Sequence, residues 1–591
     1  MPKNDLVIRV AGEAGEGVLS TGQLLVQGAA RAGYRVLTDF SPPAEIKGGY
    51  SFFQIRIGSR LFYSRGDSVD LLLAFNREAY DLSSGDLTEG GLLIYDPAEV
   101  SPPASPTRTQ YPVPLSEIAR TQLKFELGKN VVAVGVLAAL FGMPEEYLRK
   151  LLEQRFGGRG PDILNKNLGA LEAGLRYVRE HIINQPGFRR ELFEVERSPA
   201  DGRRIVVSGN QAASLGALTA GVQFFAGYPI TPASDIMEFL AAELPKVGGA
   251  VIQAEDEIAS MNMVLGASFA GKRAMTSTSG PGVSLMVEAL GLASMAELPC
   301  VLVDCQRAGP STGMPTRHEQ GDLWLAAFGG HGEIQRIVLA PTSVEDCYYQ
   351  IQHAFNLADK YQLPVILLLD TVLSVRTESI PRPDPQRIPR WSRLLYQEPN
   401  GQGVPPHEGI FLRYQLTDSG ISPMSIPGQR GGQYVATGLE HNEEGRPRYD
   451  AETKTRFTEK RFKKLAAAPQ DAPEPDFYGD ASAEIGIITW GSTAGAVREA
   501  IERAAEEGIR VAGIAPKMLW PVPDAQLRPF LEGKREVMVA EVNYNGQFAR
   551  ILEAHWGRPL RHVNAYAGEP FKVRDLLAAI RTAARAGAVA R

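Results

Sequence analysis

Cysteine is scarce in this sequence. Only Cys300, Cys305 and Cys347 occur among 591 residues, and none of them forms a C-x-x-C pair. A disulfide scaffold, a structural zinc site and a four-cysteine iron–sulfur cluster therefore lack their ligands within this chain.

Long apolar runs and basic clusters are also missing. The stretch "NVVAVGVLAALFG", residues 130–142, is too short to span a membrane and predicts a buried helix. The net charge of -6, without any long basic run, gives no indication of nucleic-acid binding. The N-terminus enters a strand pattern at once, so we expect no signal peptide, no membrane association and a cytoplasmic protein.

What is present predicts a multidomain α/β protein. At roughly 100–200 residues per domain, the chain should hold about three domains. Residues 1–185 begin with a strand–turn–helix unit, and residues 204–380 alternate short apolar strands with helices, which predicts a doubly wound, mostly parallel sheet. Residues 476–591 read as a second, smaller α/β unit. Between these segments we expect a polar linker at 186–203 and an extended region, rich in proline, glycine and charge, at 381–475.

Two turns look less specific. "GEAGEG", residues 12–17, is G-x-x-G-x-G and not the dinucleotide fingerprint, and its two glutamates would repel a pyrophosphate. It predicts a tight turn that packs a helix on a strand. "AEVNYNGQFAR", residues 540–550, places Asn543 and Asn545 after a strand, where we expect both to be exposed.

"GYPITPASD", residues 227–235, stiffens the backbone on both sides of Thr231. Each proline fixes its own φ and favours extended geometry in the residue before it. Ser234 or Asp235 is then predicted to cap the following helix. A hydroxyl and backbone amides at a helix N-terminus suit a small anion such as a carboxylate. The alternative is a plain strand-to-helix turn with Thr231 bonded locally.

Three acidic residues, 255–257, stand where a strand gives way to a helix. Ile258, Met261 and Leu265 are predicted to form one apolar face of that helix. Acids in a first helical turn commonly just answer the helix dipole, so a structural role is the alternative.

The loop "CQRAGPSTGMPTRHEQGD", residues 305–322, follows a strand and carries Arg307, Arg317 and His318. Loops beyond the carboxyl ends of parallel strands are where such sheets bind ligands, and arginine matches the geometry of a carboxylate. One of the arginines could instead tie down the loop. "STSGPG", residues 277–282, is a comparable loop before a helix.

Taken together, the motifs are more specific. "GYPITPASDIMEFL", "QAEDEIASMNMVLGASFAG", "TSTSGPGVSLM", "CQRAGPSTGMPTRHEQGDL" and "LPVILLLD" occur in that order and resemble the α subunit of 2-oxoacid:ferredoxin oxidoreductases. The segment with "GEAGEGV", "EIKGGYSFFQIRI", "KNVVAVGVLAAL" and "NLGALEAG" is similar to the γ subunit of these enzymes. The last segment, with "TWGSTAGAVREAI", "LWPVP" and "AEVNYNGQ", resembles their transketolase-C-terminal-like domain.

The resemblance covers nearly the whole chain. It implies a γ-like domain at 1–185, a thiamine-pyrimidine-binding domain at 204–380 and the transketolase-C-terminal-like domain at 476–591. A fused γ–α chain is similar to the large subunit of two-subunit enzymes that act on 2-oxoglutarate or on several 2-oxoacids.

In that family a 2-oxoacid is oxidatively decarboxylated. Coenzyme A accepts the acyl group, ferredoxin accepts two electrons, and thiamine diphosphate carries the covalent chemistry. The resemblance implies that Glu257, rather than Glu255, contacts N1′ of the aminopyrimidine, so that the 4′ nitrogen can take the proton from the thiazolium C2. It places Thr231 near the substrate carbonyl or carboxylate. The remaining implied positions are cofactor contacts at Tyr228, Pro229 and Ile230 and a carboxylate clamp at Arg307 or Arg317.

The resemblance also gives a meaning to the absences. No G-D-G, the start of the motif that holds the diphosphate through Mg²⁺, occurs in the chain, and the cysteines for a cluster are missing. We therefore expect half an active site, completed by a separate β subunit with the diphosphate, Mg²⁺ and a [4Fe–4S] cluster, in a dimer of heterodimers.

Several alternatives stay open. The chain could belong to another thiamine enzyme, such as a transketolase or an NAD- or lipoamide-linked dehydrogenase component, or it could be a non-catalytic scaffold or regulatory subunit. 2-Oxoglutarate, the expected substrate, needs a second carboxylate-binding group, for which Arg430, Lys47 and His441 are candidates. The direction of the reaction is also open, because the same site can carboxylate an acyl thioester.

Overall fold

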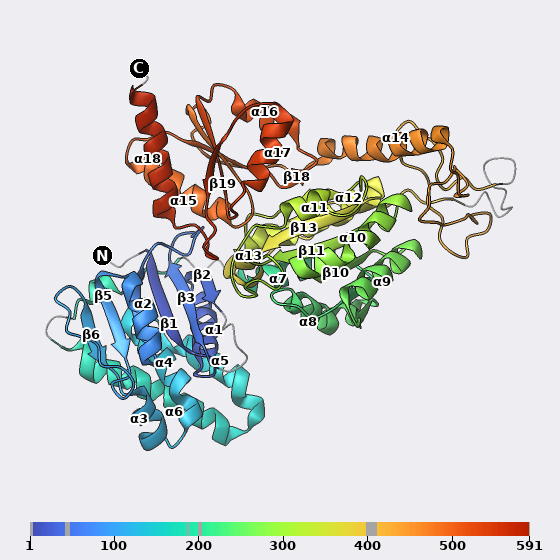
Figure 1. The fold of residues 1–591 in the computed structure, drawn as a ribbon. Helices are drawn as coiled ribbons and strands as arrows, with labels where there is room; N and C mark the ends of the chain where they lie inside the picture. The colour runs from blue at the N-terminus through green and yellow to red at the C-terminus, as the bar shows by residue number, and fades with distance from the viewer. Residues whose placement is uncertain (1–3, 42–47, 186–187, 199–203, 398–409, 590–591) are drawn as a thin grey trace. The chain divides into compact units, whose positions relative to one another are not determined.

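The computed structural model describes residues 4–41, 48–185, 188–198, 204–397 and 410–589, and it forms two compact units (Figure 1). Unit 1 contains residues 1–207 and 375–382, and unit 2 contains residues 208–374 and 383–591. Within the described ranges, no helix combines the length and the apolar character that crossing a bilayer requires.

Unit 1 is built on a mixed eight-stranded sheet, in the order β6-β5-β4-β1-β3-β2-β14-β7. The central strand β1 runs parallel to β4 and antiparallel to β3. The strands are β1 (Leu6–Glu13), β2 (Arg35–Ser41), β3 (Tyr50–Gly58), β4 (Val69–Ala74), β5 (Leu87–Tyr95), β6 (Thr109–Pro112), β7 (Arg204–Ser208) and β14 (Thr377–Pro381). The helices are α1 (Val18–Arg31), α2 (Arg77–Ser83), α3 (Leu115–Glu117), α4 (Lys129–Phe141), α5 (Glu145–Phe156) and α6 (Pro161–Val178).

Two glycines let α4 and α6 touch through their backbones. A Cβ on Gly135 would lie 2.4 Å from the carbonyl oxygen of Leu171, and one on Gly174 would lie 2.2 Å from that of Val132. The predicted apolar stretch 130–142 is therefore a buried helix, as expected.

The turn at residues 12–17 holds β1 and α1 together. Gly15 and Gly17 adopt φ angles of 98° and 91°, which side chains disfavour. The Glu16 carboxylate accepts hydrogen bonds from the Glu13 backbone at 2.8 Å and from Asn76 Nδ2 at 2.7 Å. Glu16 therefore closes the turn, which agrees with its interpretation as a tight structural turn.

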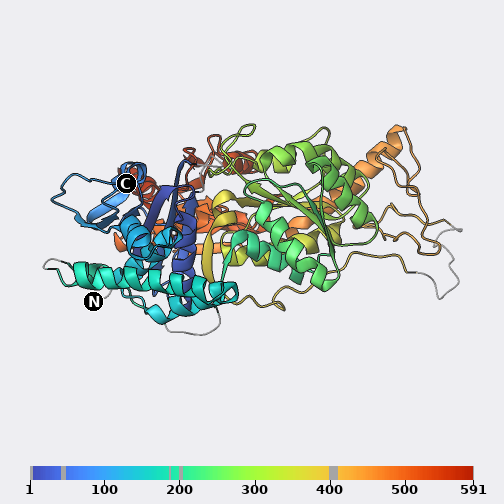
Figure 2. The same ribbon diagram turned by 90° about the horizontal axis from the view of Figure 1, so that it is seen from below.

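Unit 2 contains two sheets. The larger has the order β18-β12-β13-β11-β10-β8-β9 and is parallel except for β18 at one edge. Helices flank it on both faces (Figures 1 and 2); α9 packs against α10, and α7 packs against α12. The strands are β8 (Phe224–Gly227), β9 (Ala250–Gln253), β10 (Ala274–Thr278), β11 (Cys300–Gln306), β12 (Ile337–Leu339), β13 (Pro364–Asp370) and β18 (Met518–Trp520). The helices are α7 (Gly209–Thr219), α8 (Ser234–Glu243), α9 (Glu257–Phe269), α10 (Gly280–Met295), α11 (Leu323–Phe328), α12 (Val344–Tyr361) and α13 (Thr371–Val375).

The smaller sheet has the order β15-β17-β16-β19-β20, with β15 antiparallel to its neighbour. Its core joins that of the larger sheet through buried residues such as Trp490 and Phe548. The strands are β15 (Asp476–Gly479), β16 (Ile485–Thr489), β17 (Ala512–Ala515), β19 (Glu536–Glu541) and β20 (Arg561–Asn564). The helices are α15 (Thr493–Glu506), α16 (Asp524–Leu531), α17 (Gln547–Trp556) and α18 (Val573–Val589).

The region predicted as extended contains a long helix, α14 (Ala451–Ala467). A buried ionic cluster fixes it: Lys460 Nζ lies 2.6 Å and Lys464 Nζ 2.8 Å from the fully buried carboxylate of Glu297. Burial opposes ionisation of Glu297, but the two ammonium groups hold its pKa well below the usual range. Burial also lowers the pKa of Lys464 to about 7. The helix is therefore tied to the core of unit 2 by charges that water does not reach.

Candidate functional site

The candidate residues gather at the carboxyl edge of the larger sheet. After β8 the chain moves to β9 on one side, and after β10 it moves to β11 on the other, so β8 and β10 form a topological switch point. Ligands of open α/β sheets bind in the crevice outside such a point. Because these strands are parallel, the loops that follow β8, β9, β10 and β11 all begin at this edge.

Glu257 is the first residue of α9, at this edge. Asp256 caps the helix, with its Oδ1 accepting from the Ala259 backbone at 2.7 Å. Glu255 and Asp256 are exposed, whereas the Glu257 residue is 6% exposed. Of the three acids, only Glu257 is buried beside the switch point.

A glycine makes room for Glu257. A Cβ on Gly282, in the first turn of α10, would lie 2.7 Å from Cγ and 2.9 Å from Oε1 of Glu257, and 1.9 Å from Oγ1 of Thr278. Among the described residues, none donates a hydrogen bond to the Glu257 carboxylate. Its oxygens are therefore held in place by packing and keep their capacity to accept.

The outer face of α9 differs from the prediction. Met261 and Leu265 are buried at 0% and 3% exposure, but Ile258, in the first turn, is 49% exposed and borders the exposed face. That face carries Ile258, Asn262, Met263 and Gly266, all exposed and none charged. Periodicity alone placed Ile258 in the core, because residues 258, 261 and 265 share helical spacing.

The turn around Thr231 is joined to the loop after β11. Arg307 Nη1 donates to the Thr231 carbonyl at 2.9 Å, and Asn210 Nδ2 donates to the Pro232 carbonyl at 2.8 Å. Thr231 itself is exposed at the edge of the sheet. The structure thus brings Arg307 and the Thr231 segment together through the threonine backbone and not through its hydroxyl.

The predicted helix cap in this turn is wrong. The N-cap of α8 is Ala233, and neither Ser234 nor Asp235 caps the helix with its side chain. The Ser234 hydroxyl points backward and donates to the Ile230 carbonyl at 3.2 Å, which closes the turn. The neighbouring predicted cofactor contacts, Tyr228 and Pro229, are exposed.

The loop after β11 forms a small hairpin. The Ala308 amide donates to the Arg317 carbonyl at 3.0 Å, and the Met314 amide donates to the Ala308 carbonyl at 2.8 Å. His318 is buried, with Nδ1 3.8 Å from Asp370 Oδ1. Arg317 is half-buried, and its guanidinium forms no hydrogen bond or ion pair with any described residue. Arg307 and Arg317 therefore differ: the first is bound to the protein, and the second is not.

Sequence reasoning missed two acids at the same edge, one buried and one half-buried. Asp304, in β11, is fully buried with both oxygens lacking a partner among the described residues, and Asp322 Oδ2 is likewise shielded. Burial raises the pKa of Asp304, with Asp322 adding to it. Burial and the nearby Glu319 raise the pKa of Asp322 to about 7. The "PCVLVDCQ" pattern predicts the strand that carries Asp304, but it does not indicate that this acid is buried.

Gln320, the third missed residue, is fully buried between the two sheets of unit 2. The only signal was its place in "HEQGD", a polar run directly before α11. The asparagines predicted to be exposed differ: Asn543 is 2% exposed, and its side chain donates to the Gln320 carbonyl at 3.0 Å. Asn545 is exposed, as expected.

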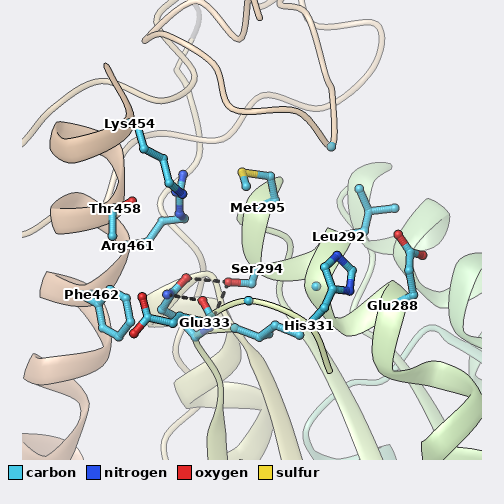
Figure 3. Close-up of a pocket in the computed structure, with 15 residues that line it drawn as sticks. Glu288, Leu292, Ser294, Met295, His331, Glu333, Lys454, Thr458, Arg461 and Phe462 are labelled. Atoms are coloured by element: carbon cyan, nitrogen blue, oxygen red, sulfur yellow. Dashed lines mark hydrogen bonds between the residues drawn. The ribbon is translucent and has the colours of Figure 1, made fainter. Parts of the chain in front are cut away.

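A separate cavity of about 360 Å³ lies between α10, residues 331–335 and α14 (Figure 3). None of the predicted site residues lines it. Its cations Lys454 and Arg461 are both paired with Glu440, at 3.1 and 2.9 Å. This cavity is therefore distinct from the site at the switch point.

The candidates for a second carboxylate contact are dispersed. His441 is fully buried and packs against Tyr414, with ring centroids 4.0 Å apart and the ring planes tilted by 49°, which is a packing role. Arg430 is exposed, and Lys47 lies outside the described residues. In the part of the chain that the structure describes, no cluster of three or more His, Cys, Asp or Glu side chains could hold a metal ion.

Comparison with known proteins places this geometry in a family. The model described as "Pyruvate flavodoxin/ferredoxin oxidoreductase, thiamine diP-bdg" matches residues 215–460. "Pyruvate ferredoxin/flavodoxin oxidoreductase" matches residues 7–177, and "Pyruvate:ferredoxin oxidoreductase core domain II" matches residues 483–576.

Curated relatives match over nearly the full length. The alpha subunit of 2-oxoacid:ferredoxin oxidoreductase 2 from Aeropyrum pernix is 32% identical over 93% of this chain and 93% of its own. The 2-oxoglutarate oxidoreductase subunit KorA of Mycobacterium tuberculosis is 33% identical over 98% of this chain and 91% of its own.

A solved structure matches as well. The 2-oxoglutarate:ferredoxin oxidoreductase of Magnetococcus marinus, with 2-oxoglutarate, coenzyme A and succinyl-CoA bound, is 41% identical with a TM-score of 0.91, over 98% of this chain and 99% of that one.

These matches, with the doubly wound sheet and its switch-point site, define an oxidoreductase subunit with a thiamine diphosphate-binding domain. The chain belongs to the 2-oxoacid:ferredoxin oxidoreductases, as an alpha subunit of a multi-subunit enzyme. The resemblance in the sequence motifs and the expected α/β fold are confirmed.

Proposed function

We propose that this chain supplies the pyrimidine side and the substrate loop of an enzyme that oxidatively decarboxylates 2-oxoglutarate. Coenzyme A would accept the succinyl group and ferredoxin the electrons. The observation that carries the proposal is the buried Glu257 carboxylate at the switch point, packed on Gly282 and without a hydrogen-bond donor among the residues that the structure describes. The reverse reaction, carboxylation of the acyl thioester, would use the same groups.

The residues present fit the aminopyrimidine of thiamine diphosphate. Its ring nitrogen N1′ carries a lone pair, so it needs a buried carboxyl group that can hold a proton between the two, and Glu257 is placed as such a group. When bound, the coenzyme supplies the electron sink for loss of CO₂ from a 2-oxoacid. Glu257 would hold a proton at the ring nitrogen, and the exposed Tyr228 and Pro229, with the half-buried Ile230, would lie along the ring.

The substrate loop would bind the carboxylate. Arg317 is the better clamp, because its guanidinium is free of partners among the described residues, whereas Arg307 is engaged with the Thr231 carbonyl at 2.9 Å. Arginine pairs with carboxylates through two parallel N–H···O bonds. The Thr231 hydroxyl, exposed at the same edge, would donate to the substrate carbonyl.

A partner subunit would complete the site. The uncharged face of α9, with Ile258 and Met263 at 49% and 41% exposure, begins next to Glu257, and Leu285 on the neighbouring α10 is 50% exposed. An apolar surface of this kind beside a cofactor site indicates a protein interface. Because this chain lacks G-D-G and cluster cysteines, the partner would carry the diphosphate, Mg²⁺ and the [4Fe–4S] cluster, in a dimer of heterodimers.

Support for 2-oxoglutarate as substrate comes from the relatives named for it and from the ligands of the Magnetococcus marinus enzyme. The test measures viologen reduction with a panel of 2-oxoacids. It uses the chain co-purified with its partner subunit, and neither NAD nor lipoamide is added. We expect 2-oxoglutarate to give the highest kcat/KM. Preference for pyruvate would refute the substrate, and dependence on NAD would refute the electron acceptor.

Glu257→Gln tests the site itself. The amide keeps the shape but cannot hold the proton, so we expect turnover to fall by about 10²-fold or more. Glu255→Gln is the matched control, because this neighbouring acid is exposed, and it should leave turnover unchanged. Equal activity of the two variants would contradict the proposal and favour a scaffold role.

A further inference from the structure

The smaller sheet of unit 2 has a switch point of its own. From β16 the chain moves to β17 on one side, and from β19 it moves to β20 on the other. The crevice outside the carboxyl ends of β16 and β19 is where a sheet of this kind binds a ligand. In this protein the crevice already holds a side chain, that of Gln320 from the loop after β11.

Gln320 is fully bonded in this crevice. Its backbone amide donates to the Val542 carbonyl at 2.7 Å, and its Oε1 accepts from the Val542 amide at 2.9 Å and from Thr493 Oγ1 at 3.0 Å. Its Nε2 donates to the Trp490 carbonyl at 3.0 Å and to Asp370 Oδ2 at 3.1 Å. Both lone pairs and both N–H groups of the amide are thus used.

Gly491 gives this amide its space. It follows β16 with a φ of 61°, and a Cβ on it would lie 2.3 Å from Gln320 Nε2. The end of the strand is therefore shaped for the glutamine.

The residues beside Gln320 are held from the same sheet. Asn543 Nδ2 donates to the Gln320 carbonyl at 3.0 Å, and Gln547 Nε2 donates to the Gly321 carbonyl at 2.6 Å. Gln547 also accepts from the Trp324 amide at 2.9 Å and, through its own carbonyl, from the indole at 3.0 Å. The loop thus contacts the smaller sheet through main-chain carbonyls as well as through the Gln320 side chain.

We propose that Gln320 is a positioning residue, and that the smaller sheet serves as the mount of the substrate loop, with its ligand crevice filled by that loop. Gln320 is three residues from Arg317, so the hydrogen bonds that fix Gln320 also fix the position of Arg317 at the edge of the larger sheet. A neutral amide suits this seat, because Asp370 is one of its neighbours and a carboxylate there would be repelled. The inference rests on the proposed role of Arg317 as the clamp of the 2-oxoacid.

The test is Gln320→Met in the complete co-purified complex. Methionine keeps the length and the burial but makes none of the amide hydrogen bonds. We expect the KM for the 2-oxoacid to rise on the order of tenfold or more, because the arginine that binds the carboxylate loses its fixed position. The KM for coenzyme A and the kcat for dye reduction should stay as in the wild type.

Gln335→Met is the matched control. Gln335 is 3% exposed, accepts from Ser294 Oγ at 2.8 Å and donates to the Glu333 carbonyl at 2.7 Å, away from the loop. It should lower the Tm about as much as Gln320→Met, without changing the oxoacid KM. A Gln320→Met complex that loses Tm but keeps the wild-type oxoacid KM would overturn the proposal.

Gln547→Leu supplies a second variant from the opposite side of the contact, and it carries the test if Gln320→Met does not assemble. It should raise the oxoacid KM as well, and the double variant should be less than additive because both changes release the same loop. Full additivity would overturn the shared mount.

Arg317→Ala separates the two proposals. An unchanged KM for the 2-oxoacid in this variant refutes the role of Arg317 as the clamp. A raised KM in Arg317→Ala together with a normal KM in Gln320→Met refutes only the positioning role of Gln320.

Discussion

A single methyl group on Gly282 should displace Glu257 without changing its chemistry. In Gly282→Ala the new Cβ would stand 1.9 Å from Thr278 Oγ1 and 2.7 Å from Glu257 Cγ, where ordinary contact begins at 3.4 Å. The neighbours must therefore give way by about 1.5 Å on the threonine side and about 0.7 Å on the glutamate side. Because Thr278 is fully buried in β10, most of the movement is expected at Glu257 and in the first turn of α10.

The expected cost falls on catalysis more than on stability. Overpacking costs about 1–3 kcal/mol, and alanine recovers up to about 1 kcal/mol of helix propensity relative to glycine. A misplacement of about 1 Å at a catalytic group costs roughly 10²-fold in rate. We therefore expect kcat for viologen reduction to fall by about two orders of magnitude with a modest drop in Tm.

Gly291→Ala provides the control on the same helix. Its Cβ would lie 3.5 Å from Ile334 Cδ1, an ordinary contact, so this variant should keep its activity and gain slightly in Tm. Steady-state dye reduction and thermal unfolding of the co-purified complexes measure both effects. Wild-type kcat in Gly282→Ala would refute the view that Glu257 is held where the coenzyme needs it.

Three further predictions concern the partner surface and the buried charges. Ile258→Glu, on the uncharged face of α9, should prevent co-purification of the partner subunit while the chain itself stays folded, as judged by its Tm; intact co-purification would contradict the interface. Glu297→Gln leaves two buried ammonium groups without their anion and should cost about 3–5 kcal/mol of unfolding free energy in denaturant titrations; a loss below about 1 kcal/mol would show that the cluster is not sealed. The raised pKa of Asp322, about 7 through burial and Glu319, means that the folded state binds more protons than the unfolded state between about pH 4 and 7, so stability falls as the pH rises through this range. Asp322→Asn should flatten that decline, and an unchanged slope of Tm against pH would assign the titration elsewhere.

The elements of the larger sheet could be predicted from the sequence because their signal is local. A strand such as β11 reads as a continuous apolar run, and α9 and α10 follow with helical spacing. Glu257 was distinguished from Glu255 only through the resemblance to a family, since both acids stand at the same strand-to-helix junction. The burial that separates them depends on Gly282, which approaches from another helix.

Other features depend on partners far away in the chain. Gln320 owes its burial to Val542, more than two hundred residues later, so no local pattern could mark it. The sequence predicts an extended region at α14 because the segment 381–475 is rich in proline, glycine and charge, although Asp450 is a visible N-cap signal. Lys460 and Lys464 of this helix can be buried because both form ion pairs with Glu297 inside unit 2.

The Glu297 cluster has a consequence for anyone who divides this polypeptide into fragments. The stretch rich in proline and glycine after residue 382 invites a cut, yet Lys460 and Lys464 reach back across it to an anion that is sealed from water. A cut there would leave one fragment with a stranded acid and the other with stranded ammonium groups. Recombinant fragments should therefore keep residues 208–374 and α14 on one chain.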